Sequence, residues 1–444
     1  MARRGVIAAV LLVVLALLPV GVARSATRAR FSAPVEAFVG SVPFRVAAAD
    51  LNGDGVPDLA TADNRAREAS VLLGKGDGSF RARASFRTVG RPADIAAADL
   101  SGDGRQDLVT VSDNRRGSVT VLLNNGAGSF RRAGVYSSGA TAPAVATTDV
   151  NHDGLIDILT ANLGRQDLGV LLGIGGGRFG PLRRFTGGYG VLDSDVGDLN
   201  GDGNVDVALA TGNYGDSIVV MLGAGDGTFG PPRQYPAGDD PVGVAIADLN
   251  HDGRQDLAVA RFTGADVSLF PGRGDGTFDA AMTTPMTGAA DYVVVADFDA
   301  DGHPDIATPS VFDAPAVASG RGDGTFEPVR LLGWVAYQGG AVADFNRDGR
   351  PDLALAAADA PEANVYLNWT GESAPPCVVL DVRRVRLRTA RRDLRDGGCR
   401  LGRVHRRSSG RVRKNRVIAP RPRIGSVLPS GTRVDLIVSR RRRQ

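Results

Sequence analysis

Short apolar segments alternate with turns rich in glycine and aspartate along residues 31–370. In one representative stretch, small and apolar residues at 93–99 lead into an acidic turn, and further runs follow at 107–112, 118–125 and 129–137. Runs of this length, bounded by turn residues, predict four β-strands connected as a meander. The first run consists of small residues in most copies, so we expect it to be the innermost strand, where neighbouring units crowd together.

Two turn patterns repeat through this region at intervals of 47 to 50 residues. The first pattern, close to D-x-N-x-D-G-x-x-D, starts at Asp50, Asp99, Asp149, Asp198, Asp248, Asp297 and Asp344. The second, G-x-G-x-F, ends at Phe80, Phe130, Phe179, Phe229, Phe278 and Phe326. A period near 50, with four short strands per unit, is typical of propeller blades. The sequence therefore predicts an all-β fold, a seven-bladed β-propeller over residues 31–370.

The two ends of the repeat array complement each other. Phe31 precedes Asp50 by 19 residues, which is the offset of Phe80 from Asp99. The last unit runs from Asp344 to about residue 370 without a glycine–phenylalanine turn. We therefore expect the N-terminal strand to complete the seventh unit, which closes the ring and removes its open sheet edges.

The acidic turns carry the residue types that bind a hard cation. Side-chain oxygens at positions 1, 3, 5 and 9 and the carbonyl at position 7 can converge on one ion, and a glycine at position 6 permits the sharp bend. Calcium, with up to seven ions, is the predicted cofactor. The predicted ligands are Asp50, Asn52, Asp54, Val56 and Asp58; Asp99, Ser101, Asp103, Arg105 and Asp107; Asp149, Asn151, Asp153, Leu155 and Asp157; Asp198, Asn200, Asp202, Asn204 and Asp206; Asp248, Asn250, Asp252, Arg254 and Asp256; Asp297, Asp299, Asp301, His303 and Asp305; and Asp344, Asn346, Asp348, Arg350 and Asp352.

Three alternatives to a calcium site in these turns are an EF-hand, a magnesium site and a loop held by hydrogen bonds alone. An EF-hand needs a glutamate at position 12 and flanking helices, and neither is predicted here. Magnesium is a weaker candidate because it retains its waters and takes few carboxylates. Internal hydrogen bonds alone could also hold such loops. We expect the second loop, with Ser101, to bind most weakly, and the sixth loop, with four aspartates, carries the most charge.

The repeated units resemble the FG-GAP or VCBS-type repeats of bacterial secreted proteins and of the propeller of integrin α subunits. The resemblance covers residues 31–370 and implies a seven-bladed calcium-binding propeller. In integrins only some blades carry such loops, whereas all seven units do here. The ligand function of integrins is therefore not transferred to this chain.

A ligand surface is expected on the face opposite the acidic turns, where the loops vary between units. Planar aromatic side chains and arginines there suit sugars or peptides. The candidates are Arg65, Arg115, Tyr189, Tyr214, Phe262, Tyr292, Trp334 and Tyr337. Ordinary loop side chains are the alternative interpretation of each.

A chemically different part follows a short linker at 371–376. Residues 377–444 contain 22 Lys and Arg against 4 Asp, a net charge of +18, whereas the preceding residues carry −15. Residues 377–439 resemble a small α+β PASTA domain, with one short helix and three β-type runs, and 440–444 form a basic tail. That resemblance implies a role at the bacterial cell wall.

The only two cysteines, Cys377 and Cys399, are predicted to form a disulfide, because an exported protein favours their pairing. The N-terminus supports export: two arginines precede an apolar run, which predicts a signal peptide at 1–25. An uncleaved membrane anchor is the alternative. The mature protein is expected to be extracellular or associated with the cell wall, without membrane insertion after cleavage.

The leading functional hypothesis is a binding or adhesion module whose basic domain attracts a cell-wall or other anionic polymer, with a glycan or protein as possible further ligand. Nucleic acid is not expected, given export. The alternatives are a lectin or a lyase-like polysaccharide enzyme built on the propeller, or a structural spacer. No catalytic residues are predicted, because the sequence has no nucleophile elbow or metalloprotease motif.

Overall fold

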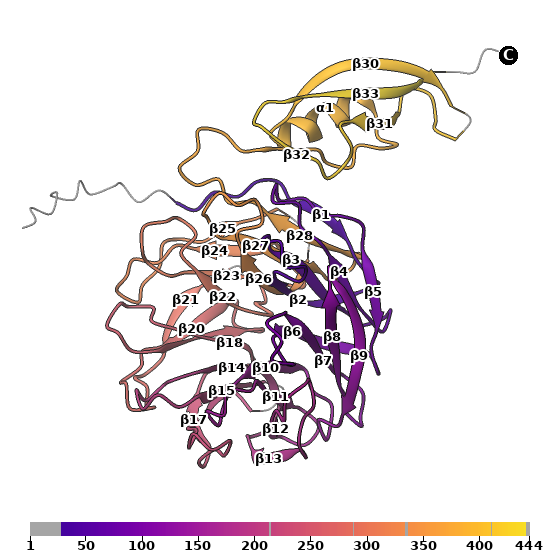
Figure 1. The fold of residues 1–444 in the computed structure, drawn as a ribbon. Coiled ribbons are helices and arrows are strands. Elements are labelled where there is room, and N and C mark those ends of the chain that lie inside the picture. Colours follow the sequence, from indigo (N-terminus) through magenta and orange to yellow (C-terminus); the bar gives the residue numbers. More distant parts are fainter. Residues whose placement is uncertain (1–27, 213–214, 287, 334–335, 410, 441–444) are drawn as a thin grey trace, which may run out of the picture.

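The computed structural model describes residues 28–440, apart from 213–214, 287, 334–335 and 410. In this part of the chain the strands form seven four-stranded antiparallel sheets, followed by a small C-terminal domain. Successive sheets lie side by side around a ring (Figure 1). This is a β-propeller, and the predicted all-β fold class is confirmed. The predicted signal peptide at 1–25 lies outside the described residues.

Each sheet is a meander, and the first to fourth strands run from the inside of the ring outwards. The sheets contain β2 (Pro43–Ala49), β3 (Asp58–Asp63), β4 (Glu68–Leu72) and β5 (Ala84–Arg87); β6 (Pro92–Ala98), β7 (Asp107–Ser112), β8 (Val119–Gly126) and β9 (Ser129–Tyr136); β10 (Ala144–Thr148), β11 (Asp157–Asn162), β12 (Asp167–Leu171) and β13 (Arg183–Thr186); β14 (Val191–Gly197), β15 (Asp206–Thr211), β16 (Ser217–Met221) and β17 (Arg233–Pro236); β18 (Pro241–Ala247), β19 (Asp256–Arg261), β20 (Asp266–Phe270) and β21 (Met282–Pro285); β22 (Val294–Ala296), β23 (Asp305–Thr308), β24 (Ala316–Ala318) and β25 (Arg330–Leu331); and β26 (Tyr337–Ala343), β27 (Asp352–Ala357) and β28 (Glu362–Tyr366) with β1 (Val35–Phe38).

The first strand of each sheet is the innermost, as its small residues predict. The first strands of successive sheets contact one another, for example β2 with β6, and β2 also contacts β26 of the last sheet. Alanines dominate β2 and β6 where they approach the axis. The small side chains allow seven strands to converge without steric conflict.

Aromatic side chains join neighbouring sheets near the outer edge. The fourth strand of one sheet presents an aromatic ring to the phenylalanine that ends the glycine turn of the next sheet. Four such edge-to-face pairs have ring centroids 5.2 to 5.5 Å apart: Phe86–Phe130, Tyr136–Phe179, Phe185–Phe229 and Tyr235–Phe278. This spacing is favourable for aromatic contacts. The phenylalanine of the repeat is therefore a packing residue between sheets.

The ring is closed by its two ends. Strand β1 pairs antiparallel with β28, so that Val35 lies opposite Val365 and Phe38 lies opposite Glu362. Val35 and Ala37 are buried, in one core cluster with Val365. The N-terminal segment therefore supplies the outermost strand of the last sheet, as the sequence predicts.

The C-terminal domain combines one helix with a three-stranded sheet. Helix α1 (Leu387–Asp396) ends at Gly397, and strand β33 (Arg433–Arg440) pairs with β30 (Arg400–Ser408) and β31 (Val417–Arg421). A separate short pair joins β29 (Cys377–Val378) and β32 (Val427–Leu428). No helix in the described ranges has the length and apolar character that a bilayer crossing requires.

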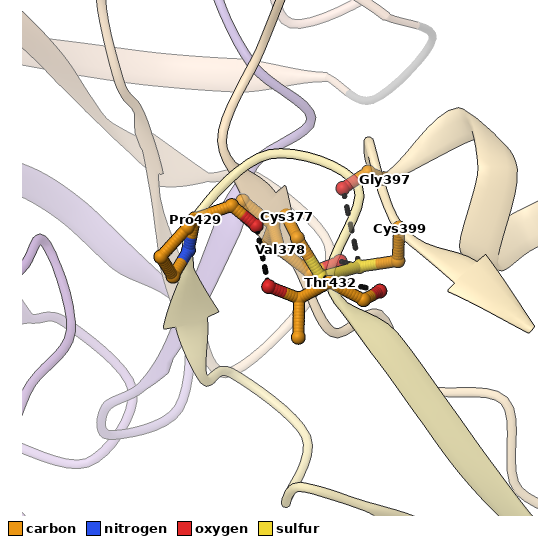
Figure 2. The surroundings of a disulfide bond; sticks show 6 residues. All are labelled: Cys377, Val378, Gly397, Cys399, Pro429 and Thr432. Atoms are coloured by element: carbon orange, nitrogen blue, oxygen red, sulfur yellow. Dashed lines mark hydrogen bonds between the residues drawn. A yellow bond between two sulfur atoms is a disulfide. The ribbon is translucent and has the colours of Figure 1, made fainter. Parts of the chain in front are cut away.

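A disulfide joins Cys377 and Cys399 within this domain (Figure 2). Both cysteines are buried in a core that includes Ala390 and Leu394 of α1 and Val434 of β33. The bond ties β29 to the chain that follows the helix. It closes a segment of 22 residues in a domain with a small core.

Opening the disulfide is expected to unfold the C-terminal domain before the propeller. Closing a loop of this length contributes roughly 3 kcal/mol. Replacing Cys377 and Cys399 by alanine should therefore make residues 377–440 sensitive to a protease at temperatures where the wild-type chain resists it. Mass spectrometry of the fragments measures this. Equal protection in both proteins would contradict the expectation.

The C-terminal domain packs on the strand that closes the ring. Val378 belongs to the same core cluster as Val35, Ala37 and Val365, and Val427 packs against that cluster. In Figure 1 the domain lies at the rim of the propeller beside β1 and β28. The contact is apolar, which fixes the domain against one sheet.

Glu36 on β1 lies beside this contact. Burial raises its pKa from 4.5 to about 7, the nearby charges of Glu362 and Asp381 add to the rise, and Arg383 opposes it. A carboxyl with a raised pKa stays protonated in the folded state while the unfolded chain loses its proton. The free energy of unfolding therefore falls as pH rises from about 5 to about 7.

Replacing Glu36 by glutamine should remove this pH dependence. At pH 8 we expect the variant to be more stable than the wild type by about 1–2 kcal/mol, a figure reduced for partial exposure to solvent. At pH 4.5 the difference should vanish. Urea unfolding at both pH values measures it, with Glu372→Gln, at an exposed glutamate, as the control. An equal gain at both pH values would contradict the assignment.

Candidate functional site

The seven acidic loops connect the first and second strands of the seven sheets; the predicted ligand residues at positions 1 to 7 lie in them, and the position-9 aspartate is the first residue of the second strand. In the first loop Gly55, at position 6, has a φ of 74°, a left-handed conformation that glycine adopts without strain. Its N–H donates to Asp50 at position 1. The same bond occurs in all seven loops at 2.7–3.0 Å. The sequence repeat therefore corresponds to a repeated loop geometry.

The aspartate at position 1 is held by the loop backbone. The carboxylate of Asp50 accepts hydrogen bonds from the N–H groups of Asn52, Gly53, Asp54 and Gly55 at 2.7–3.3 Å. Burial acts to raise its pKa, but these four bonds outweigh that effect and lower it. The carboxylate is therefore ionised and fixed in orientation.

The aspartate at position 9 links each loop to the chain at the end of the third strand of its own sheet. One carboxylate oxygen accepts an N–H there at 2.7–2.8 Å; in six sheets this N–H starts the turn to the fourth strand, and in the last sheet it belongs to Asn368 just after β28. The pairs are Asp58 with Gly74, Asp107 with Asn124, Asp157 with Gly173, Asp206 with Gly223, Asp256 with Gly272, Asp305 with Gly320 and Asp352 with Asn368. The two turn patterns of the sequence are thus parts of one structural unit.

These position-9 carboxylates lie in an unfavourable electrostatic environment. Burial raises the pKa of Asp58 to about 6 and that of Asp352 to about 8, and the like charges at positions 5 and 1 add to the rise. The backbone N–H groups act in the opposite direction. A cation bound in the loop would stabilise the ionised form of these groups.

Three of the acidic loops contain an arginine whose charge lies beside a predicted metal ligand. Their arginine at position 7 pairs with the aspartate at position 5: Arg105 with Asp103, Arg254 with Asp252 at 2.5 Å, and Arg350 with Asp348 at 2.7 Å. The guanidinium offsets part of the charge that a metal ion would neutralise. The seven loops are therefore not electrostatically equivalent.

The sixth loop has the geometry that best fits a metal ion. Carboxylate oxygens of Asp297, Asp299 and Asp305 lie within 4.8 Å of one another, and no other group of three acidic, histidine or cysteine residues in the described ranges does so. Asp299 is only 3% exposed, and neither of its oxygens has a hydrogen-bond partner of normal geometry, although the Ser319 hydroxyl is near enough to oppose the rise in its pKa. A buried carboxylate without a partner is costly. Three carboxylates that lie this close together, one of them without a hydrogen-bond partner, are suitable ligands for a hard cation.

The pKa values of this cluster lead to the same interpretation. Burial raises the pKa of Asp299 to about 6, the charges of Asp301 and Asp297 add to this, and the nearby Ser319 hydroxyl opposes it. Burial likewise raises the pKa of Asp305 to about 7. The loop holds more negative charge than its own hydrogen bonds stabilise.

Replacing Asp299 by asparagine should raise the stability of the calcium-free protein and reduce the stabilisation that calcium gives. Asparagine is the residue at position 3 in five other loops. In EDTA the variant should be more stable than the wild type by about 1–2 kcal/mol, because an unpaired buried charge is removed. The stabilisation gained on adding calcium should be smaller than in the wild type. Thermal melts in EDTA and in calcium measure both effects.

Asp301→Asn is the matched control for this prediction, because Asp301 belongs to the same loop but is exposed. It should reduce the gain from calcium and should raise stability in EDTA less than Asp299→Asn does, because it relieves only the repulsion on Asp299 and leaves the buried carboxylate in place. An unchanged calcium response of Asp299→Asn would contradict the assignment of Asp299 as a ligand.

The structure separates the predicted ligand-surface residues. Arg65 and Arg115 are exposed in turns of different sheets, and Tyr189 is 66% exposed. Phe262 is half-buried against Phe312, with ring centroids 5.7 Å apart. Two further candidates, Tyr214 and Trp334, lie outside the described residues.

The prediction for Tyr337 is wrong. Its side chain is fully buried, and its hydroxyl lies 2.8 Å from that of Tyr366 and accepts a hydrogen bond from the Asn364 amide at 3.1 Å. It packs in the core that includes Phe298 and Leu355. A tyrosine with a satisfied hydroxyl in a core cannot contact a ligand at the surface.

Tyr292 lies in a polar cluster near the axis that the repeat pattern did not predict. The Arg45 guanidinium on β2 lies 4.4 Å from the centre of the Tyr292 ring and 3.9 Å from a carboxylate oxygen of Asp291. It also donates to the carbonyl of Gln338 at 3.1 Å. Arg45, Asp94, Asp193 and Tyr292 all lie five residues before the first aspartate of their acidic turns, where the other three units have alanine or glycine, and these exceptions in the repeat were the available signal.

Carboxylates on two inner strands face the same arginine. Burial raises the pKa of Asp193 to about 7, Arg45 opposes this rise, and Asp94 adds to it. Asp94 and Asp193 also accept the N–H groups of Val145 and Val244 in the following sheets, at 2.9 and 3.1 Å. These carboxylates therefore tie neighbouring inner strands together.

The basic charge of the C-terminal domain gathers around two adjoining hollows of about 660 and 320 Å³. Their walls have no acidic residue, and none of their cations forms an ion pair with another residue in the described part of the chain. The cations are Arg384, Arg386, Arg406, Arg411, Arg413, Lys414 and Arg416. Such a concentration of unpaired positive charge attracts polyanions.

These features define a class of protein: a β-propeller with acidic turn loops between the first and second strands of its sheets. A model of the FG-GAP-like repeat matches residues 50–110, 99–160, 149–209, 198–259 and 250–308, which together span more than half of the chain. The chain belongs to this repeat family. No curated protein matches the sequence.

Solved propeller structures are similar in fold. One is an Agrocybe aegerita lectin described as recognising non-reducing terminal N-acetylglucosamine, with 24% identity, a TM-score of 0.51, and coverage of 74% of this chain and 86% of that one. Another is BBS1N in complex with ARL6DN, in a lead-soaked crystal, with 11% identity, a TM-score of 0.55 and coverage of 77% and 99%. At these identities the similarity shows the fold.

Proposed function

We propose that the protein is an extracellular binding module in which calcium ions in the acidic loops stabilise a closed seven-bladed propeller. The supporting observation is the sixth loop, where the buried Asp299 carboxylate has no hydrogen-bond partner and lies with Asp297 and Asp305 around one point. Calcium accepts such oxygen ligands in flexible geometry. The other loops share the position-6 hydrogen bond, but in the described residues none of them brings three acidic side chains within 4.8 Å of one another.

We further propose that the C-terminal domain is PASTA-like and attaches the protein to an anionic polymer of the cell envelope. The unpaired cations around its two hollows support this attachment. Guanidinium groups bind carboxylates and phosphates in bidentate fashion. The lectin with a similar fold supports a glycan as a ligand, because it shows that propellers of this shape can bind sugars.

Retention on purified cell wall and on soluble acidic polysaccharides tests the proposal. The full-length protein should be retained with calcium and eluted by salt, because exposed charges are screened at high ionic strength. Arg413→Glu combined with Lys414→Glu should weaken retention. Arg131→Glu combined with Arg132→Glu, on the exposed surface of β9, is the control with equal charge change. Wild-type protein that is not retained would contradict the attachment.

A polysaccharide-active enzyme is the second candidate. The polar cluster near the axis, around Arg45, is the observation that favours it. Asp193 has a carboxyl with a pKa raised to about 7, a value suited to proton transfer at neutral pH, and Arg45 and Tyr292 lie in the same cluster. Release of products from an acidic polysaccharide, abolished in Asp193→Asn, would support this candidate. Binding without turnover favours the binding module.

A further inference from the structure

A hollow of about 950 Å³ lies between the two domains. Strand β1 lines one side. The stretch from Lys75 to Arg83 in the first sheet and the segment Pro422–Ser426 of the C-terminal domain line the others. Because β1 and the C-terminal domain share the core cluster around Val35 and Val378, this groove has a defined shape.

Cations dominate the walls of this groove. Lys75, Arg81, Arg83, Arg383 and Arg423 line it. Two of them are already paired within their own domain, Arg83 with Glu68 at 3.9 Å and Arg383 with Asp381 at 2.6 Å. The other three form no ion pair with any residue the structure describes. The unpaired charges come from both domains, so one acidic ligand can contact both.

Two further residues restrict the kind of acidic ligand. Phe38 lines the groove and is 53% exposed, which offers an aromatic face to solvent. Glu36 also lines it, and a carboxyl opposes a ligand with dense negative charge but accepts hydrogen bonds from hydroxyl groups. An aromatic face, spaced cations and one carboxyl suit a hydroxyl-rich chain with one carboxylate per sugar. Nucleic acid or polyphosphate, with a charge on every unit, suits this mixture less well.

We propose that this interdomain groove binds a carboxylated polysaccharide, with Arg81 and Arg423 contacting its carboxylates from opposite domains and Phe38 stacking on a sugar ring. The inference rests on the proposed envelope attachment. It adds a second polymer-binding site, a groove, to the basic surface of the C-terminal domain. Binding there joins the propeller rim to the C-terminal domain. The ligand thereby becomes a bridge that stabilises their contact.

The test uses full-length protein and polygalacturonate as the probe, with dextran as neutral polymer and double-stranded DNA as dense polyanion. Arg81→Glu with Arg423→Glu should weaken polygalacturonate binding about tenfold or more, because two contacts are replaced by repulsion. Phe38→Ala should weaken it about threefold or more. Binding to DNA should change less than binding to polygalacturonate in both variants.

The matched control is Arg131→Glu with Arg132→Glu. Arg131 follows Phe130 as Arg81 follows Phe80, so it occupies the same repeat position outside the groove. This control should change the affinity less than about twofold. Equal losses in both double variants would overturn the groove and indicate general charge attraction. An unchanged affinity of Phe38→Ala would overturn the stacking contact.

Arg413→Glu with Lys414→Glu separates this inference from the proposed function. If that variant loses polygalacturonate binding and the groove variant does not, the attachment surface stands and the groove inference fails. If wild-type protein binds none of the polymers, both fail. If the groove variant loses DNA as strongly as polygalacturonate, the groove is a general polyanion site, and the inference fails.

Discussion

Removing divalent cations with EDTA is expected to lower the melting temperature of the propeller by about 15 °C. Extracellular calcium sites bind with dissociation constants of about 0.1 to 1 mM, and a site of 0.1 mM in 2 mM calcium contributes about 1.8 kcal/mol. Several filled loops sum to more than 5 kcal/mol. In a large domain each kcal/mol corresponds to roughly 2–4 °C. The unpartnered Asp299 and the position-9 carboxylates with raised pKa values are the source of this sensitivity.

Scanning calorimetry with EDTA, and then with calcium restored, measures the effect. Calcium should restore the transition fully, and magnesium should do so less well because it dehydrates reluctantly. The C-terminal domain is an internal control, since none of the seven acidic loops lies within it. Purified protein without alkaline-earth metal and with an unfolding curve indifferent to EDTA would show that hydrogen bonds alone hold the loops.

Replacing Val35 by aspartate is expected to destabilise the protein by about 3–5 kcal/mol, or about 10 °C in melting temperature. Val35 is 1% exposed, and its cluster contains Val365 of the strand it pairs with and Val378 of the C-terminal domain. A carboxylate there has no partner and must be dehydrated. One substitution should therefore weaken both ring closure and domain attachment.

Phe38→Asp is the control on the same strand, because Phe38 is exposed and lies outside that core. It should change the melting temperature by less than about 3 °C. Limited proteolysis distinguishes the two effects of Val35→Asp, since cleavage in β1 reports the opening of the ring and faster cleavage at the largely exposed 371–376 linker reports the release of the C-terminal domain. A melting temperature close to that of the wild type would show that β1 does not close the ring in solution.

The fold could be predicted from the sequence because its signals are local and repeated. The acidic turn fixes the loop between the first and second strands, and the glycine–phenylalanine turn fixes the connection between the third and fourth strands. Closure by β1 followed from the offset of Phe31 and the missing turn in the last unit. The short helix expected in the C-terminal domain is α1, whose Ala390 and Leu394 are buried in the domain core.

The site could be predicted only in part, because its decisive features are three-dimensional. Asp299 differs from the usual asparagine by one atom, and only the structure shows that its oxygens lack partners. Asp58 holds the turn at Gly74 through a hydrogen bond between residues 16 positions apart, and the sequence does not show that these two residues are in contact. Tyr337 was mistaken for a ligand residue because an aromatic residue at a strand start has the same sequence pattern whether it is exposed or buried.

Closure by β1 also has a consequence for biogenesis. The hydrogen bond from the Leu367 N–H to the Ser32 hydroxyl joins residues 335 positions apart. At the usual speed of the ribosome, of about 5–20 residues per second, roughly 20 to 70 s separate the synthesis of the two partners. During that interval the early segment has no partner strand. A chaperone that shields it until translation ends would prevent premature pairing with another nascent chain.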